Sequence, residues 1–141
     1  MNLWPAAGGA LSAIAAATHL AIVVGGPAWY RFFGAGERFA QAAERGSPMP
    51  AVVTVGIATV LAVWAAFAFS GAGLIPRLPL LRLGLVAISA IYLARALLWL
   101  PALAFRGLPV DAFAISSSLI VLAYGVVYAL GTWTAWPRLG G

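Results

Sequence analysis

Pro50–Ser70, PAVVTVGIATVLAVWAAFAFS, runs for 21 residues without a charged side chain. A helix needs roughly 20 apolar residues to cross the hydrocarbon core of a bilayer, so this stretch predicts one membrane span. Three further apolar stretches of similar length lie at about 6–26, 80–103 and 112–134. The chain of 141 residues is 64% hydrophobic and 8% charged, whereas soluble domains are about 25% charged. We therefore expect an all-α integral membrane protein, a four-transmembrane-helix bundle forming one domain over residues 1–141.

The formal net charge of +5 comes from arginine, because the chain contains no lysine. Seven of the eight arginines lie in or beside the predicted loops and termini, as is usual for the flanks of membrane helices. Those seven are Arg31, Arg38, Arg45, Arg77, Arg82, Arg106 and Arg138. Nucleic-acid binding is not expected, because it would need these charges gathered on one face. The arginines divide almost evenly between the two predicted membrane faces, so the positive-inside rule leaves the orientation open.

Composition limits the chemistry and suggests a cellular location. The chain has no cysteine, so disulfides and thiol chemistry are excluded. With one histidine and three acidic residues, neither a metal site nor a cofactor is expected. The amino terminus, MNLWPAAGG, lacks the basic region of a secretory signal, which predicts that the first helix is retained. Missing lysine and abundant alanine favour a GC-rich bacterial gene and hence the bacterial inner membrane, with a multi-pass topology.

The longest predicted connection, residues 27–49, mixes aromatic and charged residues. Within it, Glu37 to Arg45 has the pattern of a short amphipathic helix at the lipid interface, with Phe39 and alanines on its apolar side. Tryptophans lie near the predicted helix ends, as in an aromatic belt. These are Trp4, Trp29, Trp99, Trp133 and Trp136.

Polar residues are predicted to gather at one membrane face. Antiparallel connectivity brings the end of 6–26 and of 80–103 to the same face as the start of 50–70 and of 112–134. Helical spacing then predicts three inward stripes, on the first, third and fourth spans. We expect a ligand-binding pocket in this half of the membrane. Its candidate residues are His19, Glu37, Tyr92, Arg95, Trp99, Asp111, Ser117, Tyr124 and Tyr128.

Arg95 is the most informative of these residues. A guanidinium in the middle of a membrane helix costs roughly 2.5–3.5 kcal/mol on insertion scales, so it should pair, reach the interface or line water. Asp111 and Glu37 are the candidate partners. Arg95 could also extend to the interface beside Trp99 and anchor its helix, or it could hold the polar head of a ligand.

His19 likewise has more than one possible role. Its imidazole could bond to a serine or threonine on a neighbouring helix and hold the two helices together. Since the unperturbed pKa of histidine is about 6.5, it could instead transfer a proton or bind a ligand. Metal ligation is the remaining alternative.

One set of short motifs is spread along the chain between His19 and Arg95. It comprises His19, Gly25-Gly26, Trp29, Pro48, Pro50, Thr54 and Arg95. This set resembles a group of small four-helix bacterial inner-membrane proteins of unknown function, and the resemblance implies a fold and a membrane location.

A second pattern consists of Glu37-Arg38, Glu44, Tyr92 and Arg95. It is similar to the membrane-associated eicosanoid and glutathione metabolism family, whose members are trimeric four-helix bundles that bind glutathione through arginines. The asparagine of that family's motif is absent, and Gln41 and alanines stand in its place. The glutathione site is therefore not transferred. Small multidrug transporters carry a glutamate within their first helix, which this chain lacks.

We expect a membrane protein that binds a lipid-like or amphipathic molecule, with Arg95 holding its polar head and His19 hydrogen-bonding it. An alternative is a membrane enzyme acting on a lipid or thiol, in which His19 is the acid/base and Arg95 stabilises negative charge. A third possibility is a structural or accessory subunit, packed on a partner through Gly8, Ser12 and Ala15. A homo-oligomer is compatible with all three.

Overall fold

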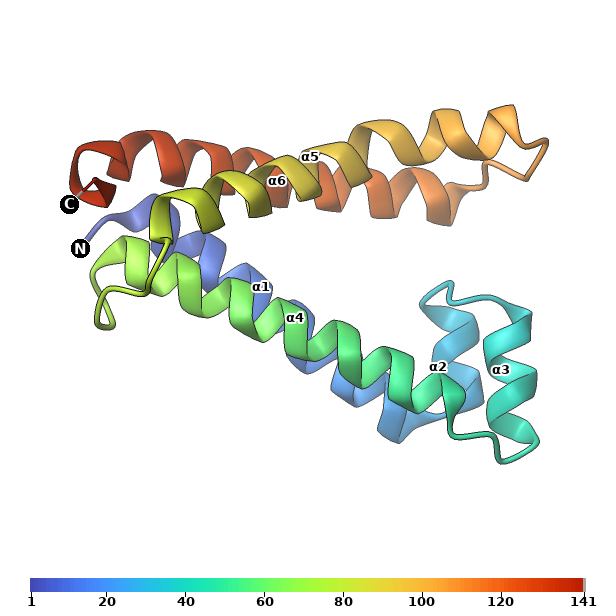
Figure 1. Ribbon diagram of the computed structural model, residues 1–141. Helices are drawn as coiled ribbons and strands as arrows, with labels where there is room; N and C mark the ends of the chain where they lie inside the picture. Colours follow the sequence, from blue (N-terminus) through green and yellow to red (C-terminus); the bar gives the residue numbers. More distant parts are fainter. Residues whose placement is uncertain (141) are drawn as a thin grey trace. The chain divides into compact units, whose positions relative to one another are not determined.

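The computed structural model describes residues 1–140, and these form helices and no strand (Figure 1). The helices are α1 (Leu3–Gly25), α2 (Pro27–Phe32), α3 (Glu37–Glu44), α4 (Met49–Ala72), α5 (Leu81–Phe105) and α6 (Ala112–Leu139). Four of them, α1, α4, α5 and α6, are long and apolar enough to cross a membrane. The all-α fold with four candidate membrane spans is therefore confirmed.

The helix ends depart most from the sequence prediction at α6. The predicted span stops at residue 134, but the helix continues through Pro137 to Leu139. Proline cannot donate a backbone hydrogen bond, which made an earlier end reasonable. The extra turn is held by side chains from another part of the chain, because Arg77 and Arg82 donate hydrogen bonds to its last carbonyl groups.

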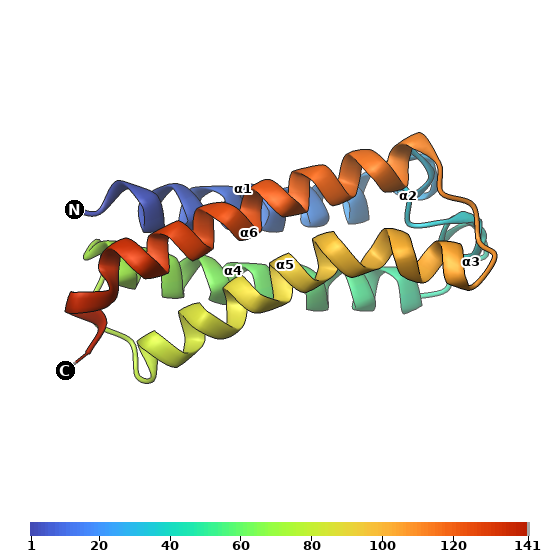
Figure 2. The same cartoon turned by 90° about the horizontal axis from the view of Figure 1, so that it is seen from above.

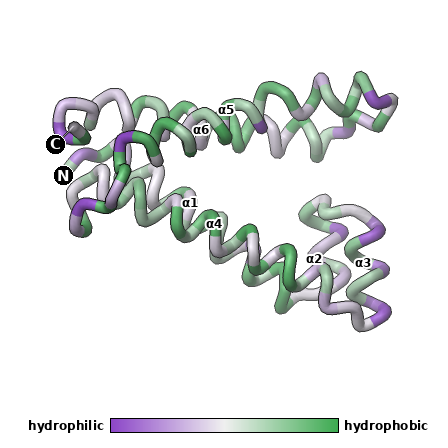
Figure 3. The backbone as a smooth tube through the Cα atoms, viewed as in Figure 1, coloured by the Kyte–Doolittle hydropathy of each residue, from purple (hydrophilic) through white to green (hydrophobic). Residues whose placement is uncertain are grey.

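The connection over residues 27–49 contains two short helices, and Figure 3 shows hydrophilic residues concentrated here. α3 confirms the predicted amphipathic helix, with Ala40 and Ala42 buried. α2 was not predicted, because Gly25-Gly26-Pro27 has the composition of a simple break. Gly26 does interrupt the helix with a positive φ of 75°, but Pro27 then starts α2 at a position where proline is favoured.

The chain divides into two compact units. The first contains Met1–Leu11 and Trp64–Gly141, and the second contains Ser12–Val63. Both α1 and α4 contribute one segment to each unit.

In the first unit, α5 and α6 form an antiparallel hairpin, and the two helices lie side by side in both Figure 1 and Figure 2. Small residues permit the close packing of helices on this hairpin. A Cβ atom added to Gly131 would lie 3.1 Å from the backbone nitrogen of Pro5, and one added to Gly8 would lie 3.1 Å from the Tyr128 ring. Glycine at both positions lets the first residues of α1 approach α6.

The second unit has its own apolar cluster beneath α2 and α3. Ile22, Tyr30 and Ala40 are buried there, and Phe33 and Phe39 pack against them. The predicted apolar side of α3 is thus confirmed.

The predicted aromatic belt consists of Trp4, Trp29, Trp99, Trp133 and Trp136. All five tryptophans lie in or near the terminal turns of helices, and each has more than a third of its surface exposed. Trp64 is the exception among the chain's tryptophans, since it lies in the middle of α4. Indoles at helix ends are typical of a protein that crosses a bilayer.

Candidate functional site

Arg95 lies near the middle of α5, and its guanidinium contacts only neutral groups. Nη1 donates to the Ser118 hydroxyl and Nη2 to the Ser117 hydroxyl, both at 3.5 Å, the long limit for a hydrogen bond. The guanidinium carbon also lies 4.7 Å from the centre of the Trp99 ring. Arg95 has five N–H donors, so two long hydrogen bonds leave most of its capacity unused.

The direction of the Arg95 side chain follows from the register of the α5–α6 hairpin. Ser89 meets Thr132 and Leu93 meets Gly125, so the Arg95 backbone lies opposite residues that follow Ser118 in the sequence of α6. The guanidinium nevertheless reaches Ser118, roughly one to two turns nearer the loop between the helices. It therefore extends towards the membrane edge, beside Trp99, as a long basic side chain does in a bilayer.

The two carboxylates expected as partners of Arg95 have other roles. Asp111 caps α6, because its Oδ1 accepts a hydrogen bond of 2.8 Å from the backbone N–H of Ala114. Glu37 binds Arg31, which also binds Glu44, each at an N–O distance of 2.8 Å. Hydrogen bonding to Arg31 holds the pKa of the Glu37 carboxyl below its usual range.

The three tyrosines predicted to line the pocket pack around one another. The ring of Tyr92 lies edge-on to the rings of Trp64 and Tyr124, and its centroid is 4.9 Å from the first and 5.7 Å from the second. The centroid of the Tyr128 ring lies 5.1 Å from that of Tyr92. Tyr124 donates to the carbonyl of Leu11, and Tyr128 donates to the carbonyl of Trp64. Tyr92 and Tyr128 are buried, so their packing role is established, and a role in ligand binding stays a prediction.

His19 is half-buried on α1, and its bonding is local. Its Nδ1 lies 2.7 Å from the carbonyl oxygen of Ala15, one turn earlier on the same helix. Since a carbonyl only accepts, Nδ1 carries the proton and Nε2 is left as the acceptor in the neutral ring. The imidazole thus meets one of its hydrogen-bonding needs within α1.

The structure therefore places most of the predicted site on the α5–α6 hairpin of the first unit. Tyr92, Arg95, Trp99, Asp111, Ser117, Tyr124 and Tyr128 belong to this hairpin. His19 and Glu37 belong to the second unit. Within residues 1–140, no three His, Asp or Glu side chains gather as metal ligands would.

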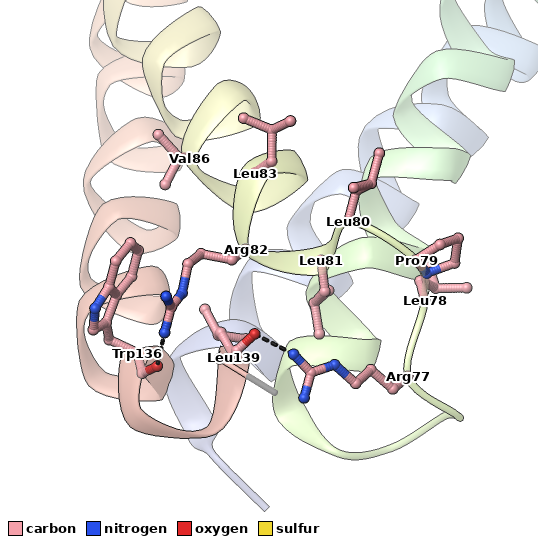
Figure 4. Close-up of a pocket in the computed structure, with 11 residues that line it drawn as sticks. Arg77, Leu78, Pro79, Leu80, Leu81, Arg82, Leu83, Val86, Trp136 and Leu139 are labelled. Atoms are coloured by element: carbon pink, nitrogen blue, oxygen red, sulfur yellow. Dashed lines mark hydrogen bonds between the residues drawn. The ribbon is translucent and has the colours of Figure 1, made fainter.

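A cavity of about 810 Å³ lies at the other end of the hairpin, where α5 begins and α6 ends (Figure 4). Its charged residues are Arg77 and Arg82, and its walls include Leu83, Val86 and Trp136. This cavity was not predicted from the sequence, because Arg77 and Arg82 were interpreted as ordinary flanking charges. The available signal was that Arg77, Arg82 and Trp136 all fall at the same end of antiparallel spans.

Trp136 and Arg82 are in direct contact in this cavity. The guanidinium carbon of Arg82 lies 4.2 Å from the centre of the Trp136 ring, and its Nη2 donates to the Trp136 carbonyl at 3.3 Å. Arg77 donates to the carbonyl groups of Arg138 and Leu139. Both guanidiniums are thus fixed by the end of α6, where the helix dipole is negative.

No protein-family model, curated protein or solved structure matches this chain.

Proposed function

We propose that this chain is a multi-pass protein of the bacterial inner membrane that binds an amphipathic, lipid-like molecule through Arg95. The ligand's anionic or strongly accepting head meets the guanidinium, and its apolar part lies along the α5–α6 hairpin. The absence of lysine and the abundance of alanine support the bacterial inner membrane as the location.

One observation carries the binding proposal: a cation within a membrane span has no carboxylate partner. Among residues 1–140, ion pairs join only Arg31 with Glu37 and Glu44. Arg95 has instead two hydroxyl contacts at 3.5 Å and an aromatic ring. A guanidinium that reaches the membrane edge without a carboxylate partner is open to lipid headgroups, to a ligand or to water.

The remaining donors of Arg95 support the same conclusion. Its Nε makes no hydrogen bond with residues 1–140, and it is not among the buried atoms without a partner there. This N–H therefore reaches the surface of the hairpin. A phosphate or carboxylate head at that surface would accept bidentate hydrogen bonds, for which the planar guanidinium is suited.

Native mass spectrometry of the detergent-purified protein tests this proposal. The wild type is compared with Arg95→Ala and with Arg106→Gln, which removes an exposed arginine from the loop next to the same end of the hairpin. We expect a co-purifying lipid-like molecule in the wild type and in Arg106→Gln, and at least a tenfold loss in Arg95→Ala. Equal occupancy in all three proteins would refute the proposal.

Ser117→Ala provides a second test that keeps the charge. It removes one weak contact of the guanidinium, so a ligand held by Arg95 should be retained. Loss of the ligand in Arg95→Ala but not in Ser117→Ala, with unchanged helical circular dichroism in both, would separate binding from folding.

A further inference from the structure

We infer that the cavity formed by Arg77, Arg82 and Trp136 is a separate binding site for one anionic phospholipid. This site lies at the opposite end of the α5–α6 hairpin from the loop towards which Arg95 extends, and it shares no residue with the Arg95 site. The occupant is defined by a phosphate head with a net negative charge and by an acyl chain. Four features of the cavity support this assignment.

The first feature is positive charge without a compensating carboxylate. Both arginines line the cavity, and neither forms an ion pair with any residue from 1 to 140. Their protein partners are backbone carbonyl groups at the end of α6. Those carbonyls carry only a partial negative charge, about half an elementary charge for the whole helix end. Two guanidiniums therefore leave a net positive charge for an anion.

The second feature is an unsatisfied donor. Arg82 Nε is buried and has no hydrogen-bond partner among residues 1–140. No other buried side-chain nitrogen or oxygen in these residues lacks a partner. Within residues 1–140, the Arg82 guanidinium donates one hydrogen bond, from Nη2 to the Trp136 carbonyl. An orphaned donor on a charge is costly, and a bound acceptor would remove that cost.

The third feature is the position of the charges relative to the bilayer. Arg82 is the second residue of α5, and Trp136 lies in the last turn of α6. Both are thus at the edge of their membrane spans, at the depth of lipid headgroups. Basic residues and tryptophan at this depth are the groups that contact phosphates and glycerol backbones.

The fourth feature is an apolar furrow that continues from the cavity along the helices. Val86 and Trp136 line both the cavity and a second hollow of about 220 Å³, which extends to Ser89 and Thr132. Ser89 lies about 12 Å along α5 from its first residue. A lipid fits this arrangement, since its head would meet Arg82 and its chain would follow the furrow into the hydrocarbon region. A free anion would use only the charged end.

Arg77 and Arg82 are held in place before any ligand arrives. Figure 4 shows each guanidinium hydrogen-bonded to the end of α6 on the wall of the same cavity. Binding therefore does not have to immobilise two long side chains, which is the usual cost of an arginine contact.

The test measures lipid retention by native mass spectrometry after delipidation in detergent. Phosphatidylglycerol and phosphatidylcholine with the same acyl chains are added separately, so that only the head charge differs. We expect this site to retain one phosphatidylglycerol per chain, with at least a roughly fivefold preference over phosphatidylcholine, about the value of one arginine at a membrane surface. Equal retention of the two lipids would overturn the inference.

Two variants separate the charge from the furrow. Arg82→Gln should lose the preference for phosphatidylglycerol, and Arg38→Gln, which removes an exposed arginine of α3, should keep it. Val86→Trp leaves both arginines in place and fills the furrow, so it should lower retention of phosphatidylglycerol as well. Val86 is exposed, so this variant should fold even if Arg82→Gln does not. Unchanged retention in Val86→Trp would overturn the inference.

Two further measurements test whether the bound phosphate belongs to a lipid and whether this site is independent of Arg95. Inorganic phosphate at the same concentration should not displace the lipid, and displacement would show that the cavity takes a soluble anion. Arg95→Gln should retain phosphatidylglycerol here, so failure of the Arg95 proposal and failure of this one are distinguishable. If Val86→Trp alters only the mass of the oligomer, the furrow is occupied by a second copy of the chain and the inference is wrong.

Discussion

Gly125 is the position where the packing of the α5–α6 hairpin makes its sharpest quantitative prediction. A Cβ atom added there would lie 2.7 Å from Leu93 Cδ2, 3.0 Å from Leu93 Cγ and 3.1 Å from the Leu93 backbone nitrogen. Ordinary contacts of this kind begin at 3.4 Å. The leucine tip can rotate away, but the backbone nitrogen can move only with α5. We therefore expect Gly125→Ala to force the two helices apart by a few tenths of an ångström.

The free-energy cost of Gly125→Ala is the difference between two terms. Overpacking of this kind costs about 1–3 kcal/mol, while replacing glycine by alanine within a helix gains about 1 kcal/mol. Gly56→Ala is the matched control, because glycine 56 is also helical and an added Cβ there meets nothing within 4 Å. The two variants should therefore differ by about 1–3 kcal/mol, the overpacking term alone.

The assay is reversible unfolding of the detergent-solubilised protein by sodium dodecyl sulfate, followed by circular dichroism. We expect Gly125→Ala to unfold at a lower detergent fraction than Gly56→Ala. If the alanine at 125 is as stabilising as the alanine at 56, the helices do not approach each other at Gly125 and the packing described for the hairpin is wrong.

Three further predictions concern single hydrogen bonds and ion pairs. The pKa of Glu37 is lowered by Arg31, so the pair stabilises the α2–α3 segment above the usual carboxyl pKa and this stabilisation is lost as pH falls through the lowered value. The protection of the α3 amides against hydrogen exchange, relative to their intrinsic exchange rates, should accordingly fall at low pH in the wild type. An equal fall in Glu37→Gln would contradict this. Tyr124→Phe removes the hydrogen bond to the Leu11 carbonyl, so it should lower the free energy of unfolding by about 0.5–1.5 kcal/mol in the same detergent titration. No change would mean that the hydroxyl is equally well satisfied elsewhere. Asp111→Ala removes the cap of α6 and should cost about 0.5–2 kcal/mol, whereas Asp111→Asn should cost much less. Equal losses in the two variants would point to the charge rather than the cap.

The four spans could be predicted from the sequence because each depends on local composition. Pro50–Ser70 has no charge over its whole length, and only a helix satisfies its backbone within a bilayer. The short helix α3 was predictable for a related reason, since its polar and apolar residues alternate with a helical period. These signals require no knowledge of what the helices contact.

The end of α6 could not be predicted because its cause lies elsewhere in the chain. Pro137 argues for an earlier end, and only the carbonyl contacts of Arg77 and Arg82 explain the continued helix. The carbonyl groups of Trp136 and Arg138 follow the arginines that bind them by 54 and 61 residues. A pattern read along one helix contains no information about such partners.

Some of the local features of the candidate residues could be predicted from the sequence. Arg95 could be identified as a candidate residue from the sequence alone, because a charge within an apolar span is rare. That Asp111 caps a helix also follows from its position immediately before an apolar run, although its charge suggested a partner for Arg95. The packing of Tyr92 against Trp64 could not be foreseen, since spacing along a helix gives the face of a residue but not its neighbour.

The capping of α6 by two distant arginines has a consequence for how the protein enters the membrane. Until α6 is synthesised, Arg77 and Arg82 have none of the carbonyl partners that they bind in the finished structure. During that interval both are positive charges without these partners, Arg77 in the connection between α4 and α5 and Arg82 in the first turn of α5. Once α6 has inserted, its last turn binds both guanidiniums. The open end of the α5–α6 hairpin therefore acquires these contacts only after the whole of α6 has been made.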